Sequence, residues 1–152
     1  MSKPVSCHDV AAYILDKCGE MTAMKLQKLL YYSQAWSLVW DEEPLFRERI
    51  EAWANGPVVP DVYECHRGLF KVSKWPKGDP SRLSKSQKAT IDAVLKHYGS
   101  KPAQWLSDLT HLERPWRQAR EGVEPGARGN TEITHAMMAE YYGGLGPDSE
   151  TL

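Results

Sequence analysis

The sequence predicts a single, mainly α-helical domain of about six or seven helices with one small two-stranded β-hairpin. Apolar residues recur three or four positions apart through most of the 152-residue chain, which is the spacing of helices with one buried face. Residues 45–54 instead include an alternation of apolar and polar side chains, as in a pleated strand. The chain is long enough to bury a sizeable core, and its 41% hydrophobic and 26% charged residues are ordinary for a globular protein.

Two helices are expected first. Ser6 is a suitable N-cap for a short amphipathic helix that ends at Gly19. Thr22 caps a second helix, which continues to about Val39 and is apolar on most of its circumference. Such a helix is expected at the centre of the fold. Its most apolar stripe consists of Leu26, Leu29, Leu30, Trp36 and Val39.

The hairpin is expected directly after this second helix. Residues 41–44 interrupt the helical spacing with three acidic residues and a proline. Residues 45–46 and 50–54 are then expected to be two extended arms around the charged residues 47–49. We therefore expect a small hairpin that lies on the helices.

A turn and a third helix should follow the hairpin. Gly56 can take the positive φ of a turn, and Pro57 is expected to set the start of the helix. Pro60 then lies in the first turn, where its missing N–H costs little. Residues 71–83 contain two prolines and a glycine, so they are expected to form an exposed connection.

Helical signals resume in the second half of the chain. Ser84 and Gln87 have the spacing of a capping box, and the helix they begin should end at Gly99. Further helices should begin near Pro102, Pro115 and Thr134, with a loop over residues 121–130 before the last one. Residues 1–142 are therefore expected to form the domain, and residues 143–152 a flexible C-terminal tail.

Positive charge is concentrated in the middle of the chain. Residues 67–101 hold nine Lys or Arg and two Asp, a net charge of +7, whereas each flank has a net charge of −4. Basic residues interleaved with Phe70, Trp75 and Tyr98 could bind nucleic acid by phosphate contacts and stacking. The same lysines fit the solvated face of an amphipathic helix or a surface for an acidic protein. A solvated face is the preferred interpretation, and nucleic acid is the least expected partner.

The chain carries none of the common local motifs of catalysis. Motifs for phosphate binding, for zinc proteases and for serine hydrolases are all missing. Asp108, His111 and Glu113 could serve a metal-dependent hydrolase or nuclease, but the same residues also fit a helix end whose backbone groups need partners. We therefore expect no enzyme, no metal and no cofactor. The three cysteines form no C-x-x-C pair and are expected to be free, buried thiols.

No signal for a membrane or for export is found. No apolar run approaches the roughly 18 residues of a membrane span, and the first residues lack the apolar stretch of a signal peptide. A cytoplasmic location without a membrane partner is expected.

Several motifs occur in order along the chain: Lys25-Leu26-Gln27-Lys28-Leu29-Leu30-Tyr31-Tyr32 with Gln34, Pro44-Leu45-Phe46, Ile50-x-Ala52-Trp53, Gly56-Pro57-Val58-x-Pro60-x-Val62-Tyr63, and Leu109-Thr110-His111 with Pro115-Trp116. Together they resemble the Panacea domain, a mostly helical family of bacteria and phages that is associated with toxin–antitoxin pairs. The resemblance extends from Val10 to Tyr142. It implies an antitoxin that neutralises a cognate toxin protein by direct binding. Some similar proteins are adaptors that deliver the bound toxin to a protease, which would then be a second partner.

Candidate partner-binding residues are polar or aromatic positions beside the expected core. Trp40 and Trp75 are expected to be exposed anchors, because one adjoins an acidic stretch and the other lies in a proline-flanked loop. The polar candidates could serve a contact face or internal hydrogen bonds, and the sequence does not choose between these roles. They are Lys25, Gln27, Lys28, Gln34 and Asn55. Structural roles are expected for Leu26, Leu29, Leu30, Trp53, Gly56, Pro57 and Trp116.

Overall fold

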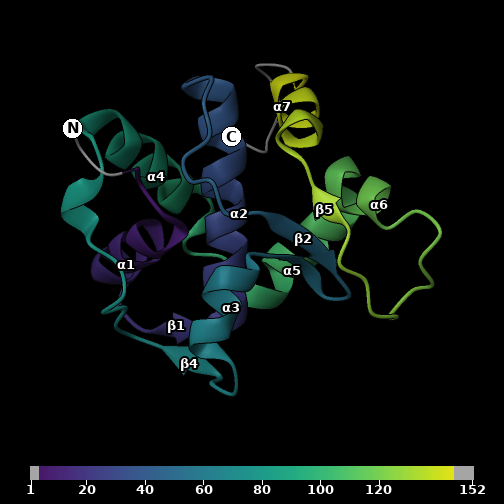
Figure 1. Ribbon diagram of the computed structural model, residues 1–152, viewed down its shortest axis with the longest axis horizontal. Helices are drawn as coiled ribbons and strands as arrows, with labels where there is room; N and C mark the ends of the chain where they lie inside the picture. The colour runs from purple at the N-terminus through teal and green to yellow at the C-terminus, as the bar shows by residue number, and fades with distance from the viewer. Residues whose placement is uncertain (1–3, 146–152) are drawn as a thin grey trace.

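The long helix α2, Ala23–Trp40, runs through the middle of the molecule, and the other elements pack around it (Figure 1). The computed structural model describes residues 4–145. Figure 1 shows α1 and α4 on one side of α2, and α6 and α7 on the other. The remaining helices are α1 Cys7–Cys18, α3 Pro60–His66, α4 Lys85–Tyr98, α5 Ala103–Leu112, α6 Arg114–Ala119 and α7 His135–Gly143, with a 3-10 helix, η1, at Pro80–Arg82.

Helix α2 is central because it buries side chains around its whole circumference. Leu26, Leu29 and Leu30 are fully buried, as predicted. The helix also buries five polar side chains, of which the three longest are Gln27, Lys28 and Gln34. Buried polar groups are costly unless they find partners, so the partners of these three show how the neighbouring segments are held.

Within residues 4–145, five short strands form two small antiparallel sheets. One sheet joins β1, Met21–Thr22, to β4, Lys71–Val72. In the other, β2, Ile50–Trp53, lies between β3, Gly56–Val58, and β5, Glu132–Ile133. The mainly helical class and the number of helices are as predicted, whereas β1, β4 and β5 were not expected from the sequence.

One of the two predicted arms of the hairpin, at residues 45–46, is not a strand. Residues 45–46 are buried but pair with no strand, and the hairpin forms instead between β2 and β3, with Ala52 opposite Pro57. Gln34 explains the difference, because its side chain takes the place of a neighbouring strand. Its Oε1 accepts from the N–H groups of Leu45 at 2.7 Å and Phe46 at 3.3 Å, and its Nε2 donates to the Phe46 carbonyl at 2.8 Å.

Two further expectations about the middle of the chain are wrong. Pro57 lies in strand β3, and the helix α3 begins instead at Pro60, whose missing N–H is harmless there. The connection 71–83 is only partly exposed, because Trp75 and Leu83 are buried. The indole of Trp75 donates to His8 Nδ1 at 3.1 Å, so a contact with α1 draws this loop onto the core.

Helix ends are largely as predicted. Ser84 and Gln87 form the expected capping box of α4, and Thr134 caps α7. Helix α7 ends at Gly143, and residues 146–152 of the expected tail lie outside the described residues. All three cysteines are free thiols, but only Cys7 is buried, so the expected burial is wrong for Cys18 and Cys65.

A cluster of tyrosines around Glu113 joins α7 to α2. The Glu113 carboxylate accepts hydrogen bonds from Tyr32 at 2.6 Å and from Tyr142 at 2.7 Å. The ring of Tyr32 stacks on that of Tyr98, with centroids 4.1 Å apart. These side chains are buried, so the carboxylate and its tyrosine partners belong to the core.

Candidate functional site

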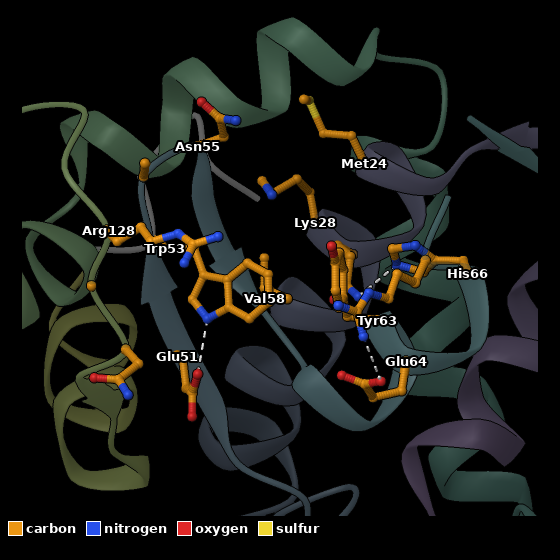
Figure 2. Close-up of a pocket in the computed structure, with 15 residues that line it drawn as sticks. Met24, Lys28, Glu51, Trp53, Asn55, Val58, Tyr63, Glu64, His66 and Arg128 are labelled. Atoms are coloured by element: carbon orange, nitrogen blue, oxygen red, sulfur yellow. Dashed lines mark hydrogen bonds and ion pairs between the residues drawn. The ribbon is translucent and has the colours of Figure 1, made fainter. Parts of the chain in front are cut away.

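A groove with a volume of about 810 Å³ lies between the first turns of α2, the β2–β3 hairpin, α3 and the loop at residues 128–130 (Figure 2). Figure 2 shows Lys28 beside Trp53 and Tyr63, with His66 beyond Tyr63. A volume of this size lies in the range of about 300–1,000 Å³ that is usual for ligand-binding pockets. We refer to this feature below as the groove.

Lys28 lies at the base of the groove and is almost completely buried, with 1% of its surface exposed. Its Nζ donates to the Pro57 carbonyl at 3.2 Å. Within residues 4–145, no carboxylate forms an ion pair with it. Burial therefore lowers the pKa of Lys28 from its ordinary value to about 7.

Gly56 makes room for this amine. Its φ is +128°, in the region that favours glycine. A Cβ at this position would lie 2.6 Å from Lys28 Cε and 3.2 Å from Thr110 Oγ1. A side chain here would therefore push Lys28 out of its place, and the turn residue predicted from the sequence also shapes the base of the groove.

Gln27 holds α3 against α2 on one wall of the groove. Its Oε1 accepts from the Val59 N–H at 2.8 Å, and its Nε2 lies 3.0 Å from His66 Nε2. Burial lowers the pKa of His66 below its ordinary value, and the nearby Lys28 lowers it further. The His66 ring also meets the Tyr63 ring edge-on, with centroids 5.3 Å apart. This wall is therefore aromatic and fixed by hydrogen bonds.

Trp53 on β2 adjoins Tyr63 and continues this aromatic wall. Its indole N–H donates to Glu51 at 2.9 Å, and its ring meets the Tyr63 ring edge-on with centroids 4.8 Å apart. The Trp53 carbonyl accepts from the Trp116 indole at 2.8 Å, which ties β2 to α6. Aromatic rings held in this way offer a large contact area with little entropy left to lose.

The acids of the groove are already engaged with arginines. Glu51 pairs with Arg49 at 3.0 Å, and Glu64 pairs with Arg67 at 3.6 Å. Lys28 and Arg128 line the groove without an ion-pair partner among the described residues. The groove therefore presents aromatic walls with unbalanced positive charge.

Comparison with known families assigns the chain. The family described as "Antitoxin SocA-like, Panacea domain" matches residues 26–117. This chain belongs to the Panacea domain family. The matched residues include Lys28, the β2–β3 hairpin and α3, so most of the groove of this Panacea domain lies inside the family segment.

One curated relative of this Panacea domain is Antitoxin SocA from Caulobacter vibrioides (strain NA1000 / CB15N). The two chains are 40% identical over 65 residues, which cover 40% of this chain and 35% of SocA. The chain thus spans about a third of the length of the curated relative it matches. No solved structure matches this chain.

The groove of the Panacea domain brings together three of the predicted partner-binding residues, Gln27, Lys28 and Asn55. Gln34 and Lys25 lie outside the groove, and Gln34 holds residues 45–46 from within the core. Internal hydrogen bonds are thus formed by Gln27, Lys28 and Gln34, whereas a contact role for the residues that line the groove stays a prediction. Sequence reasoning did not select Tyr63, His66 and Arg128 as site residues, and it gave Trp53 only a structural role. Tyr63 ends one of the motifs that resemble the family, and it lies one turn before His66 on α3.

The two tryptophans expected to be exposed differ. Trp40 is 43% exposed at the C-terminal end of α2, as predicted, and its ring stacks on Trp36 with centroids 5.0 Å apart. Trp75 is only 8% exposed, so the expectation of an exposed anchor is wrong. The proline-flanked loop suggested exposure, but the contact with His8 cannot be read from local sequence. Trp116 is half-buried against β2, in agreement with its expected packing role.

The structure does not assemble Asp108, His111 and Glu113 into one site. His111 contacts the carbonyls of Ser107 and Ala54, at 2.6 and 3.3 Å. Glu113 faces the buried tyrosines, and Asp108 accepts from Gln104 on the surface of α5. Over residues 4–145, no three His, Cys, Asp or Glu side chains are grouped as a metal site would need.

The basic segment lacks the interleaved aromatic surface that nucleic-acid stacking would use. Trp75 and Tyr98 are buried, whereas Phe70 is 76% exposed. Lys85 and Lys96 are exposed on α4, as expected of a solvated helix face. In the described part of the chain, no helix is both long and apolar enough to cross a bilayer.

Proposed function

We propose that this Panacea domain is a cytoplasmic antitoxin that neutralises a cognate toxin protein by direct binding, with the groove as the contact surface. Membership of a family described as SocA-like antitoxins supports the antitoxin role. The observation that most strongly supports the groove as the contact surface is its lining of aromatic rings around a buried amine. Among the described residues, no acid pairs with this amine. Concave surfaces with aromatic anchors and a few placed polar groups are typical of binding sites.

Apolar surface beside the groove supports a protein partner. Met24 lies at one end of the groove and is exposed. The backbone of the preceding residue, Ala23, donates to the Phe70 carbonyl at 2.9 Å, which places the exposed residues Leu69 and Phe70 near Met24. Exposed methionine and aromatic side chains that continue a concave site are enriched in protein interfaces. The apolar rim would extend the contact beyond the groove.

The polar groups of the groove favour contact over catalysis. Gln27 and Glu51 are both used to hold the walls, and His66 is held by Gln27. A rigid, pre-organised surface loses little entropy when a partner binds. The toxin would be neutralised because this domain covers its active or substrate-binding surface. Delivery of the toxin to a protease would use the same contact and a second partner in addition.

The test begins with the protein encoded by the neighbouring reading frame. If that protein is toxic, co-expression of this Panacea domain should restore growth, and the two purified proteins should bind. Tyr63→Ala and Trp53→Ala should weaken binding by a factor on the order of ten or more, because both rings line the groove. Trp40→Ala is the matched control, since Trp40 is an exposed tryptophan at the far end of α2.

Two results would contradict the proposal. Growth inhibition that is unchanged by co-expression, with no binding between the purified proteins, would remove the antitoxin role for that pair. Binding that is lost in Trp40→Ala but unchanged in Tyr63→Ala and Trp53→Ala would place the contact surface elsewhere.

A further inference from the structure

Lys28 has more hydrogen-bonding capacity than the described residues use. An ammonium group carries three N–H donors. The structure gives Nζ one acceptor, the Pro57 carbonyl at 3.2 Å, although the side chain is 99% buried. Lys28 lines the groove, so an acceptor that enters the groove would complete the hydrogen bonding of this amine.

We infer that Lys28 is a carboxylate-binding group, and that its occupant is an acidic side chain on an extended segment of the toxin that crosses the groove. This inference rests on the proposed function, because it names the chemistry of the partner at the same surface. The groove extends from Met24 at one end to residues 128–130 at the other, with Lys28 between the two ends. A segment that crosses the whole groove would reach the Lys28 amine with a side chain, whereas a terminal carboxylate would reach it only if the partner chain ended there.

The charge balance around Lys28 favours an acid as the occupant. The charged or titratable residues that line the groove beside Lys28 include His66 and Glu64 on α3, Arg67 directly after α3, Glu51 on β2 and Arg128 on the loop. Glu51 and Glu64 already pair with Arg49 and Arg67. An incoming carboxylate would therefore meet an amine that no acid within residues 4–145 neutralises, and positive charge at the rim would favour its approach.

The same geometry gives selectivity against neutral and apolar side chains. A carboxylate at hydrogen-bond distance favours the charged form of the amine and forms a charge-assisted hydrogen bond with it. An apolar side chain in the same position would exclude water and leave the amine without compensation. Discrimination by an unpaired buried group of this kind works against wrong partners more than it adds affinity. The touching rings of Trp53 and Tyr63 would supply apolar contact along one side of the segment.

A direct test uses the unmodified protein and needs no toxin. The Lys28 side-chain NMR signals are followed as a function of pH while N-acetyl-Ala-Ala-Glu-Ala-Ala-amide is added. We expect saturable shifts at Lys28 and an increase in the pKa of Lys28 on binding. The peptide with Gln in place of Glu should leave the pKa of Lys28 unchanged. A peptide of alanines with a free C-terminal carboxylate distinguishes a chain end from a side chain.

Each outcome of that titration decides the inference. No shift at Lys28 with the Glu peptide, or equal shifts with the Gln peptide, would overturn it. A stronger effect of the chain-end carboxylate would overturn the assignment to a side chain.

The second test uses the toxin and separates the two proposals. Lys28→Met removes the amine while keeping the length of the side chain, and Lys25→Met is the matched control on the same helix outside the groove. Lys28→Met should weaken toxin binding by a factor on the order of ten or more, and Lys25→Met should not. Circular dichroism checks that both variants fold.

Failure of the inference and failure of the proposed function look different in this second test. If the unmodified protein binds the toxin and folded Lys28→Met binds equally well, the carboxylate inference is wrong and the antitoxin role stands. If the unmodified protein does not bind the toxin, the antitoxin role fails for that pair, and the peptide titration still decides whether Lys28 binds a carboxylate.

Discussion

Tyr142 on α7 donates a hydrogen bond of 2.7 Å to the Glu113 carboxylate at the start of α6, in a part of the core where both side chains are buried. Tyr32 on α2 donates to the same oxygen at 2.6 Å. Three elements are thus joined at one carboxylate. Burial raises the pKa of Glu113 to about 7, although the two tyrosines favour the charged form.

The first prediction concerns this glutamate and pH. An unfolded chain releases the Glu113 proton near its ordinary pKa of 4.5, whereas the folded protein holds it to about pH 7. The folded state therefore binds more protons in this interval, and the Glu113 contribution to stability falls by a few kcal/mol as pH rises through it. Glu113→Gln should flatten this part of the pH dependence. Urea unfolding between about pH 5 and pH 8 measures it, and an unchanged slope in the variant would contradict the prediction.

The second prediction concerns Lys28 and has the opposite sign. The pKa of Lys28 is lowered from 10.5 to about 7, so the unfolded state binds more protons between these values. The Lys28 contribution to stability should therefore rise as pH increases from about 7 towards 10. Lys28→Met should remove this rise, and Lys25→Met should keep it. Chemical unfolding over that range is the measurement, and a rise that persists in Lys28→Met would assign it to another group.

The third prediction concerns Gln34, which holds residues 45–46. Gln34→Ala would leave the N–H groups of Leu45 and Phe46 and the Phe46 carbonyl without these partners in the core. We expect a loss of about 2 kcal/mol or more in the free energy of unfolding, and faster proteolysis within residues 41–49.

Gln104→Ala is the control for that substitution, because Gln104 is an exposed helical glutamine whose one partner is Asp108. Its effect should be within about 0.5 kcal/mol. Equal effects of the two substitutions would show that the Gln34 hydrogen bonds do not fix the loop.

The fourth prediction compares two tryptophans. Trp75→Ala should cost about 3 kcal/mol or more, since it removes a buried ring and the hydrogen bond to His8. Trp40→Ala should cost about 1 kcal/mol or less, because that ring is 43% exposed. Urea unfolding of both variants tests the difference, and a larger loss at Trp40 would contradict the burial that the structure assigns.

The helices are predictable from the sequence because their signals are local. Ser84 and Gln87 bond to each other three residues apart, and α4 starts where that pair does. The strands are not predictable in this way, because Ile50 pairs with Ile133, a partner from the far part of the chain. The prediction of a strand at residues 45–46 is wrong for a related reason, because the side chain of Gln34 on α2 takes the place of a strand partner.

The candidate site is predictable in part. Gln27, Lys28 and Asn55 stand out as polar residues beside an apolar pattern, and the groove contains them. Arg128 reaches the groove from a glycine-rich loop that carries no periodic signal. Its place depends on how β5 pairs with β2, which only the folded chain determines.

The order of synthesis matters for a groove built in this way. Its first walls come from residues up to Arg67, but its last side comes from residues 128–130, next to the strand that completes the β2 sheet. At roughly 5–20 residues per second, a ribosome needs roughly 3–12 s to add the intervening stretch. A nascent chain therefore carries an unfinished groove for several seconds, and full binding capacity begins only once translation has passed the late loop and strand.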